Sequence, residues 1–226
     1  MNACDILIKR GVTRLCHFTK FQSLTHIICS ANGILSRESI RQDIKNVVDE
    51  ARYDGELDYI CCSVQYPNSW FLDIAMNRNT DKLFEDWVVM YIDLDILRYR
   101  DAKFCPGNAS KNNGAYINNH MEKIDAIFAD KVPTFSYSRT KQMPRFCPTD
   151  GQAEILIKDN IPRKCIIGIA VGSEDVAKRV YAMLKINNRS EIPIYIAPNV
   201  LTTEWSKMIR NGYMPNETQC NWSEEE

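Results

Sequence analysis

Short apolar runs of strand length lie between stretches of helical periodicity, and this mixture constrains the fold more than any other feature of the chain. Residues 59–65 and 87–92 are apolar runs typical of strands. Apolar residues recur at helical spacing at residues 21–28, and again at residues 174–186 after Ser173, a predicted N-cap. Because strands and helices follow no regular βαβ rhythm, we predict an α+β fold with mixed central β-sheets flanked by helices.

The same patterns predict the remaining elements, except in one long segment. Further helices are expected at residues 5–10, 38–50, 70–74 and 117–128, with Gly11 and Gly33 as C-caps, and further strands at residues 15–19, 153–157, 165–171 and 192–196. Residues 130–151 show no clear period. A structureless stretch of that length inside a compact domain is more often functional than accidental, so we expect it to contact a substrate.

Composition and charge fit one globular domain. A chain of 226 residues that is 45% hydrophobic can bury a sizeable core, and no repeat or flexible linker divides it. We expect a single domain over residues 1–226, with a polar tail from about residue 215 that can fray. The formal net charge is only -1, so no global positive field attracts nucleic acid and any basic site must be local.

Cysteine use and hydropathy bear on the compartment and on metals. The nine cysteines are scattered and lack the paired spacing of zinc or redox motifs, and three isolated histidines do not make a metal site, so no metal is expected. No apolar run approaches the roughly 18 residues that a membrane span needs, and the N-terminus has no apolar leader. We expect a soluble, cytoplasmic protein with reduced thiols and no membrane partner.

Gln152 and Glu154 form a short pattern suited to catalysis. They stand at the head of a predicted strand, directly after the aperiodic segment. Since strand side chains alternate between faces, the amide and the carboxylate are expected to address one substrate together. A carboxylate beside a ribose can hold the 2′-hydroxyl and stabilise the positive charge that develops when a glycosidic bond breaks. The alternative is a pair of solvated polar residues on an edge strand.

Several short motifs, in their order and spacing, resemble one family. They are CHFT at residues 16–19, GILSR at residues 33–37, DEAR at residues 49–52, CSVQYPN at residues 62–68 and DGQAEILI at residues 150–157. Over about residues 15–171 the chain resembles the DarT family of DNA ADP-ribosyltransferase toxins, and the CSVQYPN run is similar to its guanine-modifying branch. The resemblance implies a single-domain ADP-ribosyltransferase-like fold and NAD⁺ as co-substrate.

The resemblance also implies roles for individual residues. Glu154 is the implied catalytic carboxylate, and we expect the neighbouring Gln152 to orient the acceptor. Arg52 is the implied active-site arginine, which would pair with an NAD⁺ phosphate or assist proton removal from the acceptor base, with Arg37 and Arg41 as rival candidates. The alternative for Arg52 is a surface salt bridge with Asp49 or Glu56. The residues implied to bind NAD⁺ are His17, Thr19, Gly33, Leu35, Arg37 and Tyr66. For His17 the alternative is a satisfied core histidine, and for Tyr66 it is packing at the start of the following helix.

The aperiodic segment interleaves aromatic and basic side chains. They are Phe135, Tyr137, Arg139, Lys141, Arg145 and Phe146. Such a segment can stack unpaired bases while it pairs with their phosphates, so we expect it to bind nucleic acid. Because a base must be unstacked before its edge can attack a ribose carbon, the expected substrate is single-stranded. The alternative is a solvated loop anchored by its aromatic residues.

These observations lead to one expected function and three alternatives. We expect an ADP-ribosyltransferase that modifies a base, with guanine as first choice, in single-stranded DNA. We further expect it to be the toxin of a toxin–antitoxin system in phage defence, with a hydrolase or a neutralising protein as its antitoxin. The alternatives are the same chemistry on RNA, the same chemistry on protein, and a catalytically inactive module that binds nucleic acid or a partner.

Overall fold

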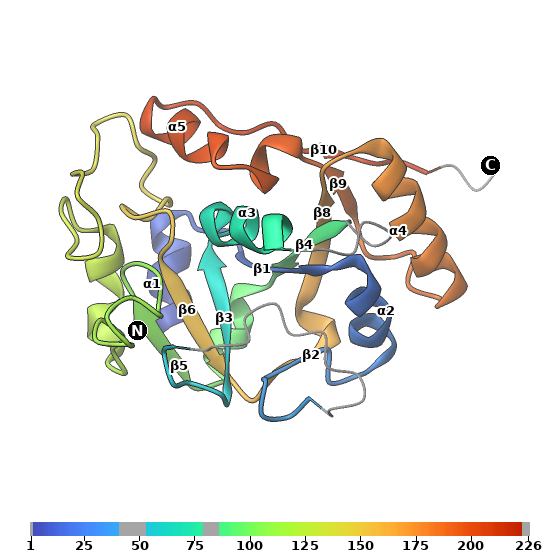
Figure 1. Cartoon of the computed structure of the whole chain (residues 1–226), viewed down its shortest axis with the longest axis horizontal. Helices are drawn as coiled ribbons and strands as arrows, with labels where there is room; N and C mark the ends of the chain where they lie inside the picture. The colour runs from blue at the N-terminus through green and yellow to red at the C-terminus, as the bar shows by residue number, and fades with distance from the viewer. Residues whose placement is uncertain (1, 41–52, 79–85, 223–226) are drawn as a thin grey trace.

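The computed structural model describes residues 2–40, 53–78 and 86–222, which form one large β-sheet with helices around it (Figure 1). The strands are β1 Leu15–Lys20, β2 Ile34–Leu35, β3 Tyr59–Val64, β4 Trp87–Ile92, β5 Ala102–Cys105, β6 Glu154–Lys158, β7 Asn160–Ile161, β8 Ile166–Val171, β9 Ile194–Ile196 and β10 Thr218–Gln219. The α-helices are α1 Ala3–Arg10, α2 Phe21–Cys29, α3 Ser69–Arg78, α4 Glu174–Ile186 and α5 Glu204–Arg210. The 3₁₀ helices are η3 Leu94–Arg98, η4 Met121–Phe128, η5 Arg163–Cys165 and η6 Pro198–Leu201.

The sheet confirms the predicted α+β class. Its strand order is β10-β9-β8-β4-β1-β3-β6-β5, and β2 pairs with β7 in a small second sheet. The paired strands are antiparallel except β8 and β9, which are parallel and connected by α4. Parallel neighbours need such a crossover. One βαβ unit is therefore built into a sheet that is otherwise antiparallel.

The central strand β4 shows why its sequence is continuously apolar. Every residue of Trp87–Ile92 is buried. Val88, Met90 and Ile92 belong to one hydrophobic core, whereas Val89 and Tyr91 belong to a second. Because successive side chains point to opposite faces, a strand that is covered on both faces needs apolar residues at every position. The structure thus confirms the strand predicted over residues 87–92.

Helix caps follow the local sequence. Asn2 and Asp5 form a capping box at the start of α1, which ends at Gly11 in the left-handed conformation with φ 88°. The Ser173 side chain accepts a hydrogen bond from the amide of Val176 at the start of α4. Both helices lie where the periodicity predicts them.

Two expected helix features differ in the structure. The chain near residue 118 is extended because Asn118 bridges to Phe104, so the helix expected over residues 117–128 is the 3₁₀ helix η4. Helix α2 ends at Cys29, and Gly33 instead makes the turn before β2, with φ 66°. A Cβ on Gly33 would lie 2.2 Å from the carbonyl oxygen of Ile161. Glycine is required there by the close approach of β7.

Three further sequence expectations concern individual segments. The helix expected over residues 38–50 lies outside the described residues from position 41 onward. Residues 130–151 contain no helix or strand, as predicted. At the polar C-terminal end, β10 pairs with β9, and Glu217 forms an ion pair with Arg14.

Among the helices that the structure describes, none has the length and apolar character needed to cross a membrane.

Candidate functional site

A cavity of about 400 Å³ lies where β1 and β3 part. The two strands pair over only two residue pairs, which end at Cys16 and Ser63. Beyond that point β1 continues along β4 and β3 continues along β6, so the strands diverge and leave a space between them. The His17 ring spans part of this space, because its Nδ1 lies 2.9 Å from the carbonyl oxygen of Cys61.

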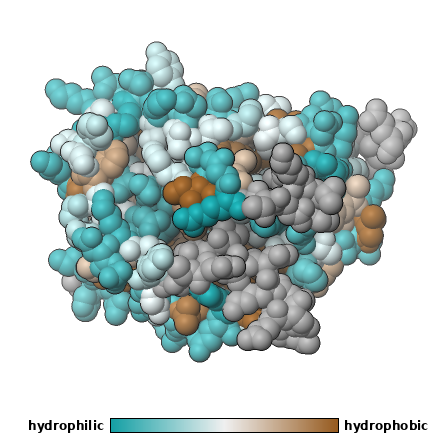
Figure 2. All heavy atoms as spheres, in the orientation of Figure 1, coloured by the Kyte–Doolittle hydropathy of each residue, from teal (hydrophilic) through white to brown (hydrophobic). Residues whose placement is uncertain are grey.

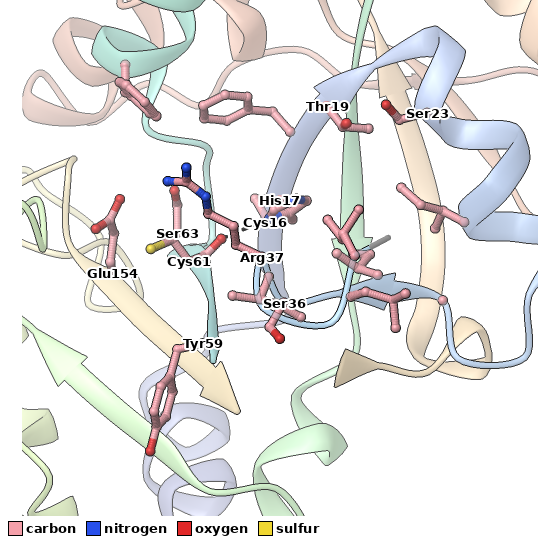
Figure 3. A pocket seen from close by; sticks show the side chains of 18 of the residues that line it. Cys16, His17, Thr19, Ser23, Ser36, Arg37, Tyr59, Cys61, Ser63 and Glu154 are labelled. Carbon is pink, nitrogen blue, oxygen red and sulfur yellow. Dashed lines mark hydrogen bonds between the residues drawn. The ribbon is translucent and has the colours of Figure 1, made fainter. Parts of the chain in front are cut away.

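The cavity collects residues that are far apart in the sequence (Figure 3). Five of the six residues implied to bind NAD⁺ line it, together with the implied catalytic carboxylate: His17, Thr19, Gly33, Leu35, Arg37 and Glu154. They come from β1, from the segment after α2 and from β6. The structure therefore brings residues of separate sequence motifs together in the wall of one cavity.

Glu154 is fixed in place by its neighbours. It is the first residue of β6, only 6% exposed, and one carboxylate oxygen accepts a hydrogen bond of 2.7 Å from the backbone N–H of Ala109. A buried carboxylate needs such donors, and they also restrict its rotamer. The carboxylate is thus preorganised at the cavity wall before any substrate binds.

Glu154 lies in a cross-strand row with two thiols and a hydroxyl. Cys16 pairs with Ser63, Ser63 with Glu154, and Glu154 with Cys105, so these four side chains share one face of the sheet. Burial raises the pKa of both the Cys16 and the Cys105 thiol to about 12. Since only a thiolate is a strong nucleophile, these cysteines are uncharged packing groups near neutral pH.

The loop that holds Ala109 depends on a close approach at Gly107. A Cβ on Gly107 would lie 2.4 Å from the side chain of Thr134 and 2.6 Å from the carboxylate of Asp150. The Thr134 hydroxyl in turn donates to the carbonyl oxygen of Pro106 at 3.0 Å. Gly107 therefore lets the loop after β5 pack against the segment that precedes Glu154.

Of the three candidate arginines, Arg37 is the one that the structure describes. Its side chain extends into the cavity, with the guanidinium directed towards the side on which Ser63 is drawn (Figure 3). Arg41 and Arg52 lie outside the described residues. A guanidinium at this wall suits a phosphate or a carboxylate, because its fork of N–H groups matches their oxygen atoms.

Tyr66 is not among the residues that line the cavity. It is 4% exposed, and its ring packs against Trp205 with a centroid distance of 5.1 Å. The preceding residue, Gln65, has φ 66°, which turns the chain away from β3. This location favours the packing alternative for Tyr66 over contact with NAD⁺.

Gln152 lines a second cavity of about 430 Å³ that adjoins the first. The two cavities share Phe71, Asn108 and Ser110. The expected strand alternation does not include Gln152, because β6 begins only at Glu154. Gln152 lies in a turn, and its backbone N–H donates a hydrogen bond to the Asp150 carboxylate. Gln152 and Glu154 therefore line two adjoining cavities and do not share one face of a strand, in contrast to the prediction.

Sequence patterns did not single out these three shared residues. Asn108 and Ser110 belong to a stretch rich in Gly and Asn at residues 105–115, whose composition indicates only a loop. Phe71 was part of a predicted helix, where an aromatic residue usually packs in the core. The only available signal was the position of the loop directly after a strand, which many unrelated loops share.

The aperiodic segment divides into anchored and exposed side chains. The Arg139 guanidinium donates to the carbonyl oxygens of Cys147, at 2.6 Å, and Pro144, and burial lowers its pKa. Phe146 packs against both hydrophobic cores. Lys141 and Arg145, by contrast, are exposed. Tyr137 is 67% exposed, and the half-buried Phe135 contacts it edge-on with ring centroids 5.5 Å apart.

The chemistry available at the site is that of a carboxylate and a guanidinium around one enclosed space. The carboxylate can stabilise positive charge on a ribose carbon, and the guanidinium can pair with phosphate. Within residues 2–40, 53–78 and 86–222, no group of three or more His, Cys, Asp or Glu side chains is placed to hold a metal ion.

Solved structures of low sequence identity share this fold. DarT of Thermus sp. 2.9, in complex with ADP-ribosylated ssDNA, superposes with a TM-score of 0.61 and 16% identity, over 84% of this chain and 96% of that chain. The same protein in complex with NAD⁺ gives 0.55 and 17%, over 83% and 96%. DarTG of Thermosipho africanus, in complex with ADP-ribose, gives 0.54 and 16%, over 84% of this chain and 51% of that chain.

Sequence comparison assigns the family. A comparison with curated proteins finds no match. Residues 16–202 match the family model described as "ssDNA thymidine ADP-ribosyltransferase, DarT". This region contains the whole first cavity and the segment that leads to Glu154. The chain therefore belongs to the DarT family of single-stranded DNA ADP-ribosyltransferases.

Proposed function

We propose that this protein transfers ADP-ribose from NAD⁺ to a base of single-stranded DNA and releases nicotinamide. The observation that carries the proposal is the buried Glu154 carboxylate, held by the Ala109 amide in the wall of a cavity large enough for part of a dinucleotide. The similar Thermus protein was solved with NAD⁺ and with ADP-ribosylated ssDNA, which supports the same ligands here.

In the proposed reaction the bond between ribose C1′ and the nicotinamide nitrogen breaks. Nicotinamide leaves with the bonding electrons as a neutral molecule, and a base nitrogen bonds to C1′ and loses its proton. Glu154 stabilises the charge that develops on the ribose. Arg37 pairs with an NAD⁺ phosphate, and Arg52 assists the loss of the base proton, which passes to water because a guanidinium stays protonated. His17 and Thr19 line the same NAD⁺ pocket, as do Gly33 and Leu35.

The second cavity is the proposed place of the acceptor base. It adjoins the first cavity through Phe71, Asn108 and Ser110, so a base there faces a ribose held beside Glu154. Gln152 lines this second cavity, and its amide can hydrogen-bond the edge of a base. The segment that carries Tyr137, Lys141 and Arg145 follows Thr134 at its rim and supplies contacts to the neighbouring nucleotides.

For the modified base we place guanine first and thymine second. The CSVQYPN run at residues 62–68 resembles the guanine-modifying branch, whereas the description of the matching family model names thymidine. The two bases offer different donors and acceptors on the edge that faces an active site, so one pocket does not hold both equally well.

Labelled NAD⁺ tests the reaction and its acceptor together. The purified protein is incubated with oligonucleotides that contain a single guanine, a single thymine or neither, and with RNA and protein pools. We expect label on the single-stranded DNA that contains guanine, with free nicotinamide formed in equal amount. Label on the thymine oligonucleotide alone would move the base to thymine. Label on RNA or protein alone, or on nothing, would reject DNA as the substrate.

We also propose that the protein is a cytoplasmic toxin that an antitoxin controls, as the resemblance to a toxin family implies. The Thermosipho structure is of a DarTG protein, and this chain matches 51% of it. An antitoxin that reverses the modification acts as a hydrolase on the DNA, whereas one that neutralises the protein covers its cavity. Expression should arrest growth in the wild type and not in Glu154→Ala at equal protein level. Equal arrest by both would attribute it to something other than the reaction.

A further inference from the structure

Helix α5 and the aperiodic segment meet on the surface beside the second cavity. The Thr140 hydroxyl donates to the carbonyl oxygen of Arg210 at 2.6 Å, and the Arg210 guanidinium donates back to the carbonyl oxygen of Ser138 at 2.7 Å. Gly212 approaches Gln142 so closely that a Cβ on it would lie 3.3 Å from the Gln142 Cβ. The last turn of α5 is thus joined to the tip of the segment (Figure 1).

Aromatic rings and a guanidinium gather at this junction. The Arg210 guanidinium lies over the Phe135 ring at 5.5 Å and over the Tyr137 ring at 5.9 Å. Tyr137, beside this cation, is 67% exposed, and Tyr213, three residues after Arg210 in the chain, is 69% exposed. Exposed rings beside a cation offer flat surfaces on which unpaired bases stack, and the cation can contact the adjacent phosphate.

The junction is locally positive although the whole protein is not. Residues 131–149 contain Lys131, Arg139, Lys141 and Arg145 and no Asp or Glu, and Arg210 on α5 adds a further cation, whereas Lys207 pairs with Glu204. Within the described parts of the chain, Lys141, Arg145 and Arg210 form no ion pair with a carboxylate. These cations are therefore available to a polyanion.

The character of the exposed surface favours a polar partner over an apolar one. On the face drawn in Figure 2, brown atoms form only small, separate patches among hydrophilic ones. Large exposed apolar patches would instead indicate a protein interface. The same segment also reaches the second cavity, because Thr134 lines that cavity and Phe135 follows it directly in the chain.

We propose that Arg210 and Tyr213, together with Tyr137, bind the nucleotides that flank the modified base on single-stranded DNA. This inference rests on the proposed function and extends it to a part of the chain outside the family match, which ends at residue 202. Arg210 contacts a phosphate and keeps Tyr137 in place, and the two exposed tyrosines stack flanking bases. The surface contributes to binding longer strands and leaves the chemical step to the residues around Glu154.

The test compares short and long substrates in Arg210→Gln, Tyr213→Ala and Tyr137→Ala. Binding of labelled single-stranded DNA of about 4 and about 12 nucleotides is measured by fluorescence anisotropy, within the range of site sizes that such proteins cover. Each tyrosine variant should bind the long strand about 10-fold more weakly and the short strand nearly as the wild type does. Arg210→Gln should also reduce the slope of log affinity against log salt by about 0.7. In Arg210→Gln and Tyr213→Ala the rate of NAD⁺ hydrolysis by water should not change.

Arg179→Gln is the matched control, because Arg179 is an exposed cation on α4 that pairs with Asp86, remote from the junction (Figure 1). Tyr213→Ala should fold as the wild type does, because in the described structure the exposed Tyr213 side chain forms no hydrogen bond or ring contact. Unchanged binding of the long strand by Tyr213→Ala and Arg210→Gln would overturn the inference. Equal losses for short and long strands would overturn it too. A wild type that binds the long strand more tightly but modifies no DNA would reject the proposed function and leave the binding surface standing.

Discussion

Glu154 and Ala109 are joined by a hydrogen bond of 2.7 Å, in which the backbone N–H of Ala109 donates to the carboxylate. This bond ties the loop after β5 to the first residue of β6. Backbone donors hold a carboxylate without adding a titrating group or a flexible side chain. The position of Glu154 therefore depends on how that loop packs.

Glu154→Gln should abolish transfer while the protein stays folded. The amide oxygen of Gln can still accept from Ala109, but the negative charge that stabilises the transition state is lost. We expect transfer to fall by about 10²-fold or more, with a Tm within a few degrees of the wild type. The measurement is single-turnover transfer from labelled NAD⁺, with Glu191→Gln, an exposed residue, as the control. Near-normal turnover by a folded Glu154→Gln protein would remove Glu154 from the mechanism.

Gly107→Ala should weaken catalysis from a distance. The added Cβ would lie within 2.6 Å of Thr134 and Asp150, so the loop must shift and the Ala109 amide moves away from Glu154. Overpacking of this kind costs about 1–3 kcal/mol of stability. We expect a lower Tm together with a fall in kcat that exceeds any rise in the KM for NAD⁺.

Gly172→Ala serves as the comparison, because its added Cβ would meet only Leu201, at 3.8 Å. It should leave both Tm and kcat close to their wild-type values. If both variants lose the same activity, the close contact at Gly107 has no special role in positioning Glu154.

Strands and helices with strong local signals could be predicted from the sequence, and elements that depend on distant partners could not. β4 has a continuous apolar run, and α4 has an N-cap followed by helical periodicity. Both predicted elements are confirmed. β5 and β10 are short strands at the sheet edges, where the pairing partner rather than the local pattern decides the structure. Gly33 was expected to end a helix, but the approach of β7 determines its role.

Arg37 and Arg52 should affect different kinetic constants. Arg37 lines the NAD⁺ cavity, so Arg37→Ala should raise the KM for NAD⁺ by about 10-fold or more, the usual effect of losing a hydrogen bond to a charged group. Arg37→Lys should recover part of this loss, because it keeps the charge but not the fork of donors. Arg52→Ala should mainly lower kcat for transfer to the base. Steady-state kinetics of both variants, and of Arg41→Ala as the third candidate arginine, measure these constants. An unchanged KM for NAD⁺ in Arg37→Ala would contradict the assignment.

Asp150→Asn should change how stability depends on pH. Burial raises the pKa of the Asp150 carboxyl, so the folded protein binds this proton more tightly than the unfolded chain does. The stabilisation is fully present below the unfolded pKa of about 3.9 and is lost as pH rises through the folded value. Asn does not titrate, and its side-chain oxygen can still accept from the Gln152 amide.

The stability of Asp150→Asn relative to the wild type should therefore increase as pH rises from about 4 to about 7. Urea unfolding of both proteins at several pH values measures this difference. Asp130→Asn is the control, since Asp130 is exposed. A difference that stays constant, or that decreases with pH, would show that burial does not dominate the titration of Asp150.

The sequence could not predict that the site has two cavities, and the reason is geometric. Gln152 and Glu154 are two residues apart, which predicts one face in a strand, but the strand begins at Glu154. The Asp150 carboxylate accepts a hydrogen bond from the backbone N–H of Gln152, and this bond holds Gln152 in a turn before the strand. Such a side-chain bond competes with strand pairing and leaves no periodic signature. His17 and Thr19, in contrast, line one cavity as the resemblance implies, because both residues of the motif lie two apart within β1.

The aperiodic segment should separate into residues that hold its shape and residues that bind DNA. Arg139→Gln removes donors to the carbonyl oxygens of Pro144 and Cys147, so it should lower the Tm and weaken every activity that needs the segment. Neutralising Lys141 and Arg145 together should leave the Tm unchanged, because both are exposed. That double variant should bind single-stranded DNA more weakly across sequences and reduce the slope of log affinity against log salt by about 1.4, two cations at about 0.7 each. Phe146→Leu should behave like the Arg139 variant, since Phe146 packs in the core.

Gln152→Ala should then distinguish the acceptor site from the NAD⁺ site. Gln152 lines the second cavity and not the first, so its loss should impair transfer to the base more than the slow hydrolysis of NAD⁺ by water. The ratio of these two rates, measured in one reaction with labelled NAD⁺ and excess oligonucleotide, is the informative quantity, because a general loss of fold lowers both rates together. Thr19→Ala provides the opposite case, since Thr19 lines the first cavity and its loss should lower both rates in proportion. If Gln152→Ala also lowers transfer and hydrolysis in equal proportion, Gln152 supports the fold or NAD⁺ binding, and the base is accepted elsewhere.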